Sequence, residues 1–270
     1  MSRGKNSTWQ RRLGLFGQAL FLVACSVLFA PLAGAQNIMQ SKLIESGQST
    51  VNISTDELQQ ALASGSDHLL DVRSEMEYAI SHIPGAINVP EKEVEKILEM
   101  FPDKDTPIIL TCNGPFCGKS KRVAPLLVGA PNNYTHVRRY QLGLPVWRAL
   151  GNTVQTDLLG FEYIFNRDDT AVFVDARAAQ DFRSETVACA VNIQPGEAEA
   201  ANGDGRLPFT DKGARVVVFA DDPVLAKKVA VEIANKAYWS SSYFGGTFED
   251  LKNDKNLHLQ SLTRCRNGMK

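Results

Sequence analysis

The chain contains an internal repeat, and this repeat constrains the fold more than any other feature of the sequence. Residues 69–90 align without gaps to residues 173–194, within the segment 172–195. Asp71-Val72-Arg73 matches Asp175-Ala176-Arg177, an offset of 104 residues (71 to 175), and 86–89 matches 190–193 at the same offset. A repeat of this length indicates two similar domains rather than a solenoid.

Each repeat alternates short apolar runs with stretches of helical character. In the first repeat the predicted strands are 69–72, 87–89, 108–111 and 137–140. The predicted helices are 55–64, 75–81, 91–100, 119–128 and 145–150. This alternation predicts an α/β fold in which each domain has a mainly parallel sheet flanked by helices. Active sites in such sheets lie at the carboxyl ends of the strands.

The charge composition excludes some partner classes. The 270 residues include 29 basic and 30 acidic side chains, so the chain has no bulk attraction to nucleic acid or to anionic membranes. Neither a metal nor an organic cofactor is implied by the residue patterns.

The N-terminus has the pattern of a secretory signal peptide. Arg11-Arg12 precede the apolar run 13–32, and Ala33-Gly34-Ala35 supplies small residues for cleavage. We therefore expect a signal peptide over 1–35, a linker over 36–50, and export, with the bacterial periplasm as the destination. An uncleaved membrane anchor and a lipoprotein acylated at Cys25 are the alternatives.

The stretch 107–122 (PIILTCNGPFCGKSKR) carries the candidate chemistry. The predicted strand 108–111 delivers Cys112 into a loop rich in glycine and proline, and Lys119 opens a helix. Loop amides and a helix N-terminus favour an anion, so we expect the pKa of Cys112 to be lowered.

These segments resemble the rhodanese (sulfurtransferase) family. The resemblance rests on Asp71-Val72-Arg73, the segment 77–90, the strand-end Cys112, and the segment 140–147 (YQLGLPVW). It indicates a tandem, exported form with rhodanese-like domains over 51–152 and 153–258 and a C-terminal tail over 259–270.

The resemblance implies that Cys112 is a nucleophile that takes the outer sulfur of a small anionic donor such as thiosulfate. Cys112 would carry that sulfur as a persulfide and pass it to cyanide or a thiol, with a redox or sulfur-carrier protein as a possible partner. Lys119, with Lys121 or Arg122 behind it, would attract the donor. An anion cradle is expected from the backbone amides of Asn113, Gly114, Phe116, Cys117, Gly118 and Lys119.

The loop departs from the family pattern in two respects. Six residues separate Cys112 from Lys119-Ser120, where family loops have four before an Arg-Ser pair, so the loop is longer. It also contains a second thiol, Cys117, which is either a resolving or protective thiol or a small, partly buried side chain.

The second repeat lacks a nucleophile at the matching position. Its strand 215–219 runs into Ala220-Asp221, so either alanine or aspartate replaces Cys112. We expect an inactive domain that packs against the first.

Other polar residues have structural interpretations. Asp71 and Arg73 are either supports of the active loop or, as we favour, a buried ion pair that sets the fold, because the second repeat keeps the pair. His82 is expected to fix a turn. Cys189 and Cys265 are candidates for a disulfide, which sequence alone cannot establish.

Three rival functions remain open at this point. A phosphatase would need an arginine where Lys119 stands. A non-catalytic binding module would make Cys112 incidental. A dithiol redox protein would use Cys112 and Cys117 together.

Overall fold

The computed structural model describes residues 37–257 and 259–260. The predicted signal peptide, Cys25, His258 and Cys265 lie outside the described residues. Within the described part, no helix is long and apolar enough to cross a membrane. Export and the predicted domain limits stay predictions.

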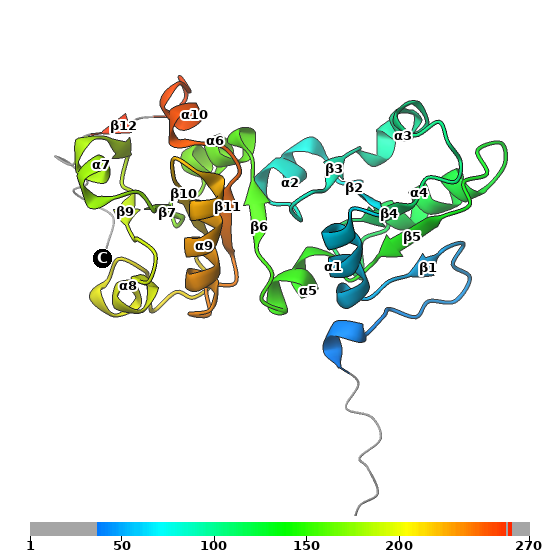
Figure 1. The fold of residues 1–270 in the computed structure, drawn as a ribbon, viewed down its shortest axis with the longest axis horizontal. Helices are drawn as coiled ribbons and strands as arrows, with labels where there is room; N and C mark the ends of the chain where they lie inside the picture. The colour runs from blue at the N-terminus through cyan, green and yellow to red at the C-terminus, as the bar shows by residue number, and fades with distance from the viewer. Residues whose placement is uncertain (1–36, 258, 261–270) are drawn as a thin grey trace, which may run out of the picture. The chain divides into compact units, whose positions relative to one another are not determined.

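The first repeat forms a five-stranded sheet in the order β1-β5-β4-β2-β3, with every pair of neighbours parallel (Figure 1). Its strands are β1 (Val51–Asn52), β2 (His68–Asp71), β3 (Ile87–Asn88), β4 (Ile108–Thr111) and β5 (Val137–Tyr140). Its helices are η1 (Ile38–Gln40), α1 (Thr55–Ser64), α2 (Glu75–Ile80), η2 (Glu91–Glu93), α3 (Val94–Met100), α4 (Lys119–Val128) and α5 (Gly143–Ala149).

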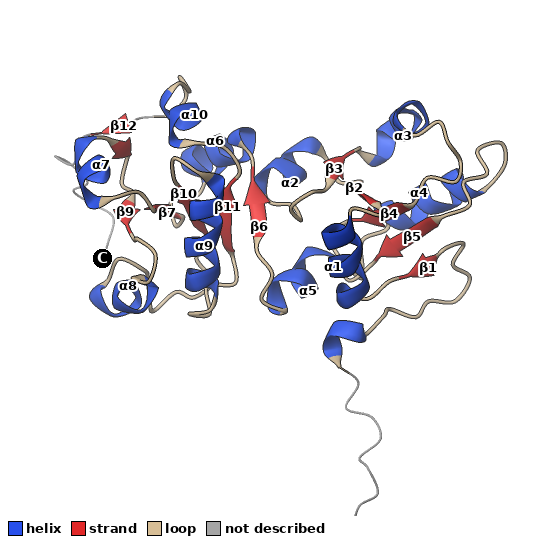
Figure 2. Cartoon of the chain, viewed as in Figure 1, coloured by secondary structure: helices blue, strands red, loops and turns tan. Residues whose placement is uncertain are grey.

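The second repeat forms a five-stranded parallel sheet of the same order, β6-β11-β10-β7-β9 (Figure 2). Its strands are β6 (Val154–Thr156), β7 (Val172–Asp175), β9 (Val191–Asn192), β10 (Val216–Phe219) and β11 (Ser241–Phe244). Its helices are α6 (Leu158–Arg167), α7 (Ala179–Ser184), α8 (Ala198–Asp204), α9 (Pro223–Ala234) and α10 (Phe248–Lys252). A small antiparallel pair adds β8 (Thr186–Val187) and β12 (Leu259–Gln260). The predicted fold class, with two similar α/β units, is confirmed.

Local sequence signals set most of the element boundaries. Helix α1 begins with a capping box: the Ser54 side chain accepts a hydrogen bond from the Glu57 backbone N–H, and the Glu57 carboxylate accepts one from the Ser54 backbone N–H. The helix ends at Gly65, which has φ 65°. A second capping box, Ser74 with Glu77, begins α2. The predicted helix 91–100 is instead divided into η2 and α3.

The central strands explain the two-sided core. All four residues of β4 are buried, and successive side chains face opposite sides of the sheet. Leu110 packs in the cluster that contains Val123 and Leu127 of α4. Ile109 packs in the cluster with Leu58 and Trp147. Helices therefore cover both faces of the sheet, as a parallel sheet requires.

A buried polar unit occurs in both repeats at the carboxyl end of the second sheet strand from the edge. Arg73 pairs with Asp71 at 2.5 Å and donates to the carbonyl of Ser81 at 2.7 Å. Asn88 donates to the carbonyls of Asp71 and Arg73 at 2.9 and 3.0 Å.

The second repeat reproduces these bonds residue for residue. Arg177 pairs with Asp175 at 2.8 Å and donates to the Glu185 carbonyl at 2.6 Å. Asn192 donates to the carbonyls of Asp175 and Arg177 at 2.8 Å each. The interpretation of Asp71 and Arg73 as a buried ion pair is confirmed.

We expect Asp175→Ala to lower the free energy of unfolding by about 3–5 kcal/mol, because it leaves Arg177 buried without its counter-ion. Asp221→Asn is the matched control, since Asp221 also faces Arg177 (3.8 Å) but is 66% exposed. This control should cost under about 1 kcal/mol. Urea denaturation followed by circular dichroism measures both, and equal midpoints for the two variants would contradict the prediction.

Candidate active site

The candidate site is the loop between β4 and α4, residues 112–118. Cys112 directly follows β4, and Gly118 is the residue before the first turn of α4. The loop therefore lies at the carboxyl end of a central parallel strand and at a helix N-terminus. This location agrees with the sequence prediction.

Cys112 lies in the core rather than at the surface. Its exposed fraction is 0%, and its Sγ lies 3.4 Å from Ser120 Oγ and 3.6 Å from the Cys117 carbonyl oxygen. The hydrogen bond that it shares with the Cys117 side chain, followed by burial, raises the pKa of Cys112. The predicted low pKa of Cys112 is therefore wrong, because the amides and the helix end do not outweigh these two effects.

Cys117 has the properties that the sequence suggested for Cys112. Its side chain is partly exposed. Its sulfur accepts a hydrogen bond from the Cys112 thiol and further bonds from the backbone N–H groups of Lys119 and Asn113. The bond from Cys112 is the largest cause and, with these amides, lowers the pKa of Cys117 to about 6.

The predicted amide cradle is thus only partly available to an external anion. The amides of Asn113 and Lys119 already serve the Cys117 sulfur. The Cys117 amide donates to the Gly114 carbonyl at 2.9 Å, so it serves the loop itself. Phe116 is fully exposed at the loop, and a Cβ added to Gly118 would collide with the Arg122 guanidinium.

Gln141, which follows β5, holds the loop in shape. Its Nε2 donates to the carbonyls of Gly114, Pro115 and Cys117 at 3.1, 3.3 and 3.0 Å. Its Oε1 accepts from Ser120 Oγ at 2.8 Å, and Ser120 in turn contacts Cys112. The sequence prediction missed this role, although Gln141 lies in the segment 140–147 that carries the family resemblance.

Gly143 fits closely beneath the same loop. It has φ 64°, and a Cβ at this position would lie 2.5 Å from Gly114 Cα and 2.6 Å from the Cys112 carbonyl oxygen. Only glycine accommodates both the backbone conformation and this close approach.

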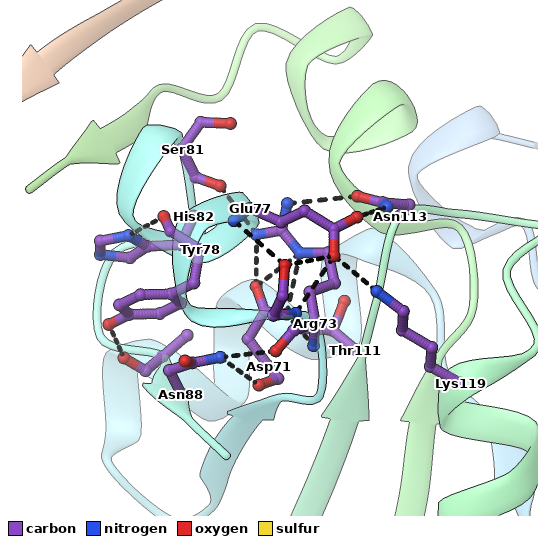
Figure 3. A network of polar contacts seen from close by, with 12 residues as sticks. Asp71, Arg73, Glu77, Tyr78, Ser81, His82, Asn88, Thr111, Asn113 and Lys119 are labelled. Carbon is purple, nitrogen blue, oxygen red and sulfur yellow. Dashed lines mark hydrogen bonds and ion pairs between the residues drawn. The ribbon is translucent and has the colours of Figure 1, made fainter. Parts of the chain in front are cut away.

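The predicted cations are all paired with carboxylates. Lys119 Nζ lies 2.5 Å from Glu77, Arg122 pairs with Glu91, and Lys121 pairs with Glu45. Figure 3 shows how Lys119 and Asn113 converge on Glu77. Burial raises the pKa of Glu77, but hydrogen bonds from Lys119, Ser74 and Asn113 outweigh it and lower that pKa to about 2.

The buried ion pair reaches the loop through one contact. Arg73 Nη1 donates to Asn113 Oδ1 at 3.2 Å, while the rest of its guanidinium faces Asp71 and Ser81 (Figure 3). Arg73 is 3% exposed. Asp71 and Arg73 therefore support the loop from inside the fold.

His82 also has structural contacts. Its ring stacks on Tyr78 at 3.8 Å, and its Nδ1 lies 3.0 Å from the Tyr78 carbonyl oxygen. Its backbone exchanges hydrogen bonds with Gln155 of the second repeat at 3.0 and 2.9 Å. Burial lowers the pKa of His82, with Asp157 opposing the shift.

The second repeat replaces the loop with a short connection. The pairings of Asp71 with Thr111 and of Asp175 with Phe219 make Ala220, also 0% exposed, the counterpart of Cys112. Asp221 faces Arg177 as Asn113 faces Arg73, and Asp222 caps α9. The described part of this repeat has no cysteine at the matching strand end.

The remaining sulfur chemistry involves Cys189, which is disulfide-bonded. Cys265 lies outside the described residues, so the pairing of Cys189 with Cys265 stays a prediction. Across residues 37–257 and 259–260, no group of three or more histidine, cysteine or acidic side chains could hold a metal ion.

Comparison with known proteins supports the family resemblance that the sequence motifs indicate. Residues 54–150 match the rhodanese-like domain model. Human thiosulfate:glutathione sulfurtransferase is 50% identical over 50 residues, which are 18% of this chain and 44% of the relative. The thiosulfate sulfurtransferase PspE of Escherichia coli is 38% identical over 73 residues, 26% of this chain and 65% of the relative. The chain thus spans less than two thirds of the length of these curated relatives.

A solved structure is also similar: a thiosulfate sulfurtransferase from Pseudomonas aeruginosa, 20% identical, with a TM-score of 0.36. The match covers 73% of this chain and 43% of that chain. Residues 54–150 of the chain therefore form a rhodanese-like domain. Its two parallel sheets of identical strand order are consistent with tandem rhodanese-like domains.

We expect Cys117 to be alkylated by iodoacetamide with a rate that rises through pH 6, because its thiolate forms above its lowered pKa. The rate should fall as the pH drops below this value. Cys112→Ala removes the hydrogen-bond donor and should move the midpoint towards that of an ordinary thiol. Peptide mass spectrometry between about pH 5 and 9 measures both rates, and a midpoint near pH 8.5 in the unmodified chain would contradict the prediction.

Proposed function

We propose that this protein is a sulfurtransferase that moves sulfane sulfur from a small anionic donor such as thiosulfate to a nucleophilic acceptor, cyanide or a thiol. The sulfur is carried as a persulfide on the loop 112–118. Sequence resemblance assigns the persulfide to Cys112, and that assignment stays a prediction.

One observation carries the proposal: two free cysteines share a loop at a strand end and a helix N-terminus. A thiolate held there by backbone amides can displace sulfite from thiosulfate, and the same amides stabilise the anionic persulfide. The rhodanese-like domain match, residues 54–150, contains this loop.

The rival functions fit the contacts less well. A phosphatase needs a free, planar guanidinium over the loop, but Lys119 is bound to Glu77 and Arg122 to Glu91. A binding module does not need a thiolate supported by two amides. We further propose that the protein is exported, which the mass of the mature N-terminus would test.

We expect thiosulfate and cyanide to yield sulfite and thiocyanate with the unmodified protein. The double variant Cys112→Ala/Cys117→Ala should yield neither product above the uncatalysed rate. Colorimetric detection of thiocyanate measures the reaction. If the double variant turned over thiosulfate as fast as the unmodified protein, the result would contradict the proposal and favour a binding role.

The pairing of Lys119 generates a second prediction. Glu77→Gln keeps a capping-box side chain at the start of α2 but removes the negative charge beside Lys119. We expect the KM for thiosulfate to fall by about two- to fivefold at low ionic strength, consistent with a partly exposed ion pair. The difference should disappear in high salt.

Glu91→Gln is the matched control, because it removes the carboxylate that pairs with Arg122 in the same way. Arg122 is more exposed than Lys119, with 62% against 28% of the side chain exposed. It should change KM less than Glu77→Gln. An unchanged KM in Glu77→Gln at low salt would show that Lys119 does not attract the donor.

A further inference from the structure

The loop contains two thiols with unequal access, and the proposed function needs only one. Cys112 is 0% exposed, whereas Cys117 is partly exposed. Attack on thiosulfate requires the nucleophilic sulfur to reach the outer sulfur of the donor in line with the bond that breaks. A sulfur enclosed by the core cannot meet that requirement without a change in the loop.

The contacts around each sulfur show a division of roles. Backbone hydrogen bonds from Lys119 and Asn113 help to lower the pKa of Cys117, whereas the single backbone hydrogen bond from Ser120 does not offset the Cys117 hydrogen bond and the burial that raise the pKa of Cys112. Cys112 instead packs among core side chains and touches Ser120, which Gln141 holds in place. Cys112 is also hydrogen-bonded to Cys117, so the two sulfurs are direct neighbours.

We propose that Cys117 is the thiol that receives the donor sulfur, and that Cys112 is a resolving thiol that closes a Cys112–Cys117 disulfide and releases hydrosulfide. This proposal rests on the proposed sulfurtransferase function and specifies its nucleophile and acceptor. It reverses the roles that the sequence suggested for the two cysteines.

The first step forms a persulfide on Cys117. The Cys117 thiolate attacks the outer sulfur of thiosulfate, a new sulfur–sulfur bond forms, and the donor's sulfur–sulfur bond breaks. Sulfite leaves with the bonding electron pair. The negative charge now lies on the outer sulfur of the persulfide, within reach of the amides that held the thiolate.

The second step uses the position of Cys112 beside the inner sulfur. Cys112 Sγ attacks Cys117 Sγ, the Cys112–Cys117 disulfide forms, and the bond to the outer sulfur breaks. The proton of the Cys112 thiol leaves with the outer sulfur as hydrosulfide. The two cysteines are thereby oxidised by two electrons and the sulfane sulfur is reduced by two electrons.

A further turnover requires a reductant, which we assign to the class of low-molecular-weight thiols or protein dithiols. Two such thiols reduce the disulfide by thiol–disulfide exchange and are themselves joined as a disulfide. Cys117 is the partly exposed cysteine of the pair, so it is the one that these thiols can reach.

The chain itself provides a conservative variant for the buried position. Ala220 occupies the equivalent place in the second repeat and is also fully buried. Cys112→Ala should therefore fold while removing the resolving thiol. The assays are run at about pH 9, above the pKa of an ordinary thiol, so that Cys117 is ionised in both proteins.

The test treats reduced protein with thiosulfate, without added thiol, and measures sulfite, hydrosulfide and intact mass. The unmodified protein should release one equivalent each of sulfite and hydrosulfide and lose two hydrogens. Cys112→Ala should release sulfite but no hydrosulfide and gain one sulfur, located on Cys117 by peptide mapping. Cys117→Ala should release sulfite at least about 100-fold more slowly than Cys112→Ala, the scale of loss when a nucleophile is removed.

Each alternative outcome would contradict a separate part of the proposal. A persulfide on Cys112 in Cys117→Ala, with Cys112→Ala inert, would return the nucleophile to Cys112 and leave the proposed function standing. A stable persulfide in the unmodified protein without hydrosulfide would eliminate the resolving step. Absence of sulfite from all three proteins would refute the proposed function together with this inference.

Discussion

The structure depends on a buried charge pair at the end of one strand in each repeat. Aspartate and arginine two residues apart neutralise each other inside the fold, and the guanidinium also binds the carbonyl that ends the following helix. An asparagine from the neighbouring strand closes the unit by binding both backbone carbonyls. Because these buried polar groups find partners in one another, the strand, the helix and the next strand are held as one piece. In the first repeat one remaining donor reaches Asn113, so the unit that holds the fold together also contacts the loop 112–118.

Most of the fold could be predicted from the sequence because its signals are local. Capping residues and glycine place α1 almost to the residue, and the apolar run 108–111 predicts β4 with its full burial. Because the second repeat has a similar sequence, the same order of strands and helices is predicted for the second unit. The short edge strands β1 and β6 were harder, since two or three residues show no alternation and are strands only because β5 and β11 pair with them. The division of 91–100 into η2 and α3 likewise has no strong signal, because Pro90 supplies no side-chain cap.

The site was predicted in location but not in detail, for a physical reason. The strand predicts where Cys112 leaves the sheet, but the path of a loop with two extra residues depends on contacts that are distant in sequence. Gln141 draws three loop carbonyls towards itself, and Gly143 allows the loop to lie directly on the backbone. These contacts leave Cys117 partly exposed and Cys112 fully buried. Residue types alone could name two thiols, but only the packing distinguishes which one meets solvent.

Comparison of the two repeats separates packing from chemistry. The residue after the central strand is fully buried in both repeats, cysteine in one and alanine in the other, so this position accommodates a small side chain in each. The two repeats differ again further along the chain, where one has a long loop with a second cysteine and the other has Asp221 and a helix cap. The surrounding lysine and arginine side chains are matched by carboxylates, so the stabilisation of an anion depends mainly on backbone amides. The amide dipoles of a loop that is held by Gln141 are less screened by salt than exposed cations are. They stabilise negative charge on a sulfur that lies close to them. The stabilisation of an anion at this site therefore depends on the conformation of the loop.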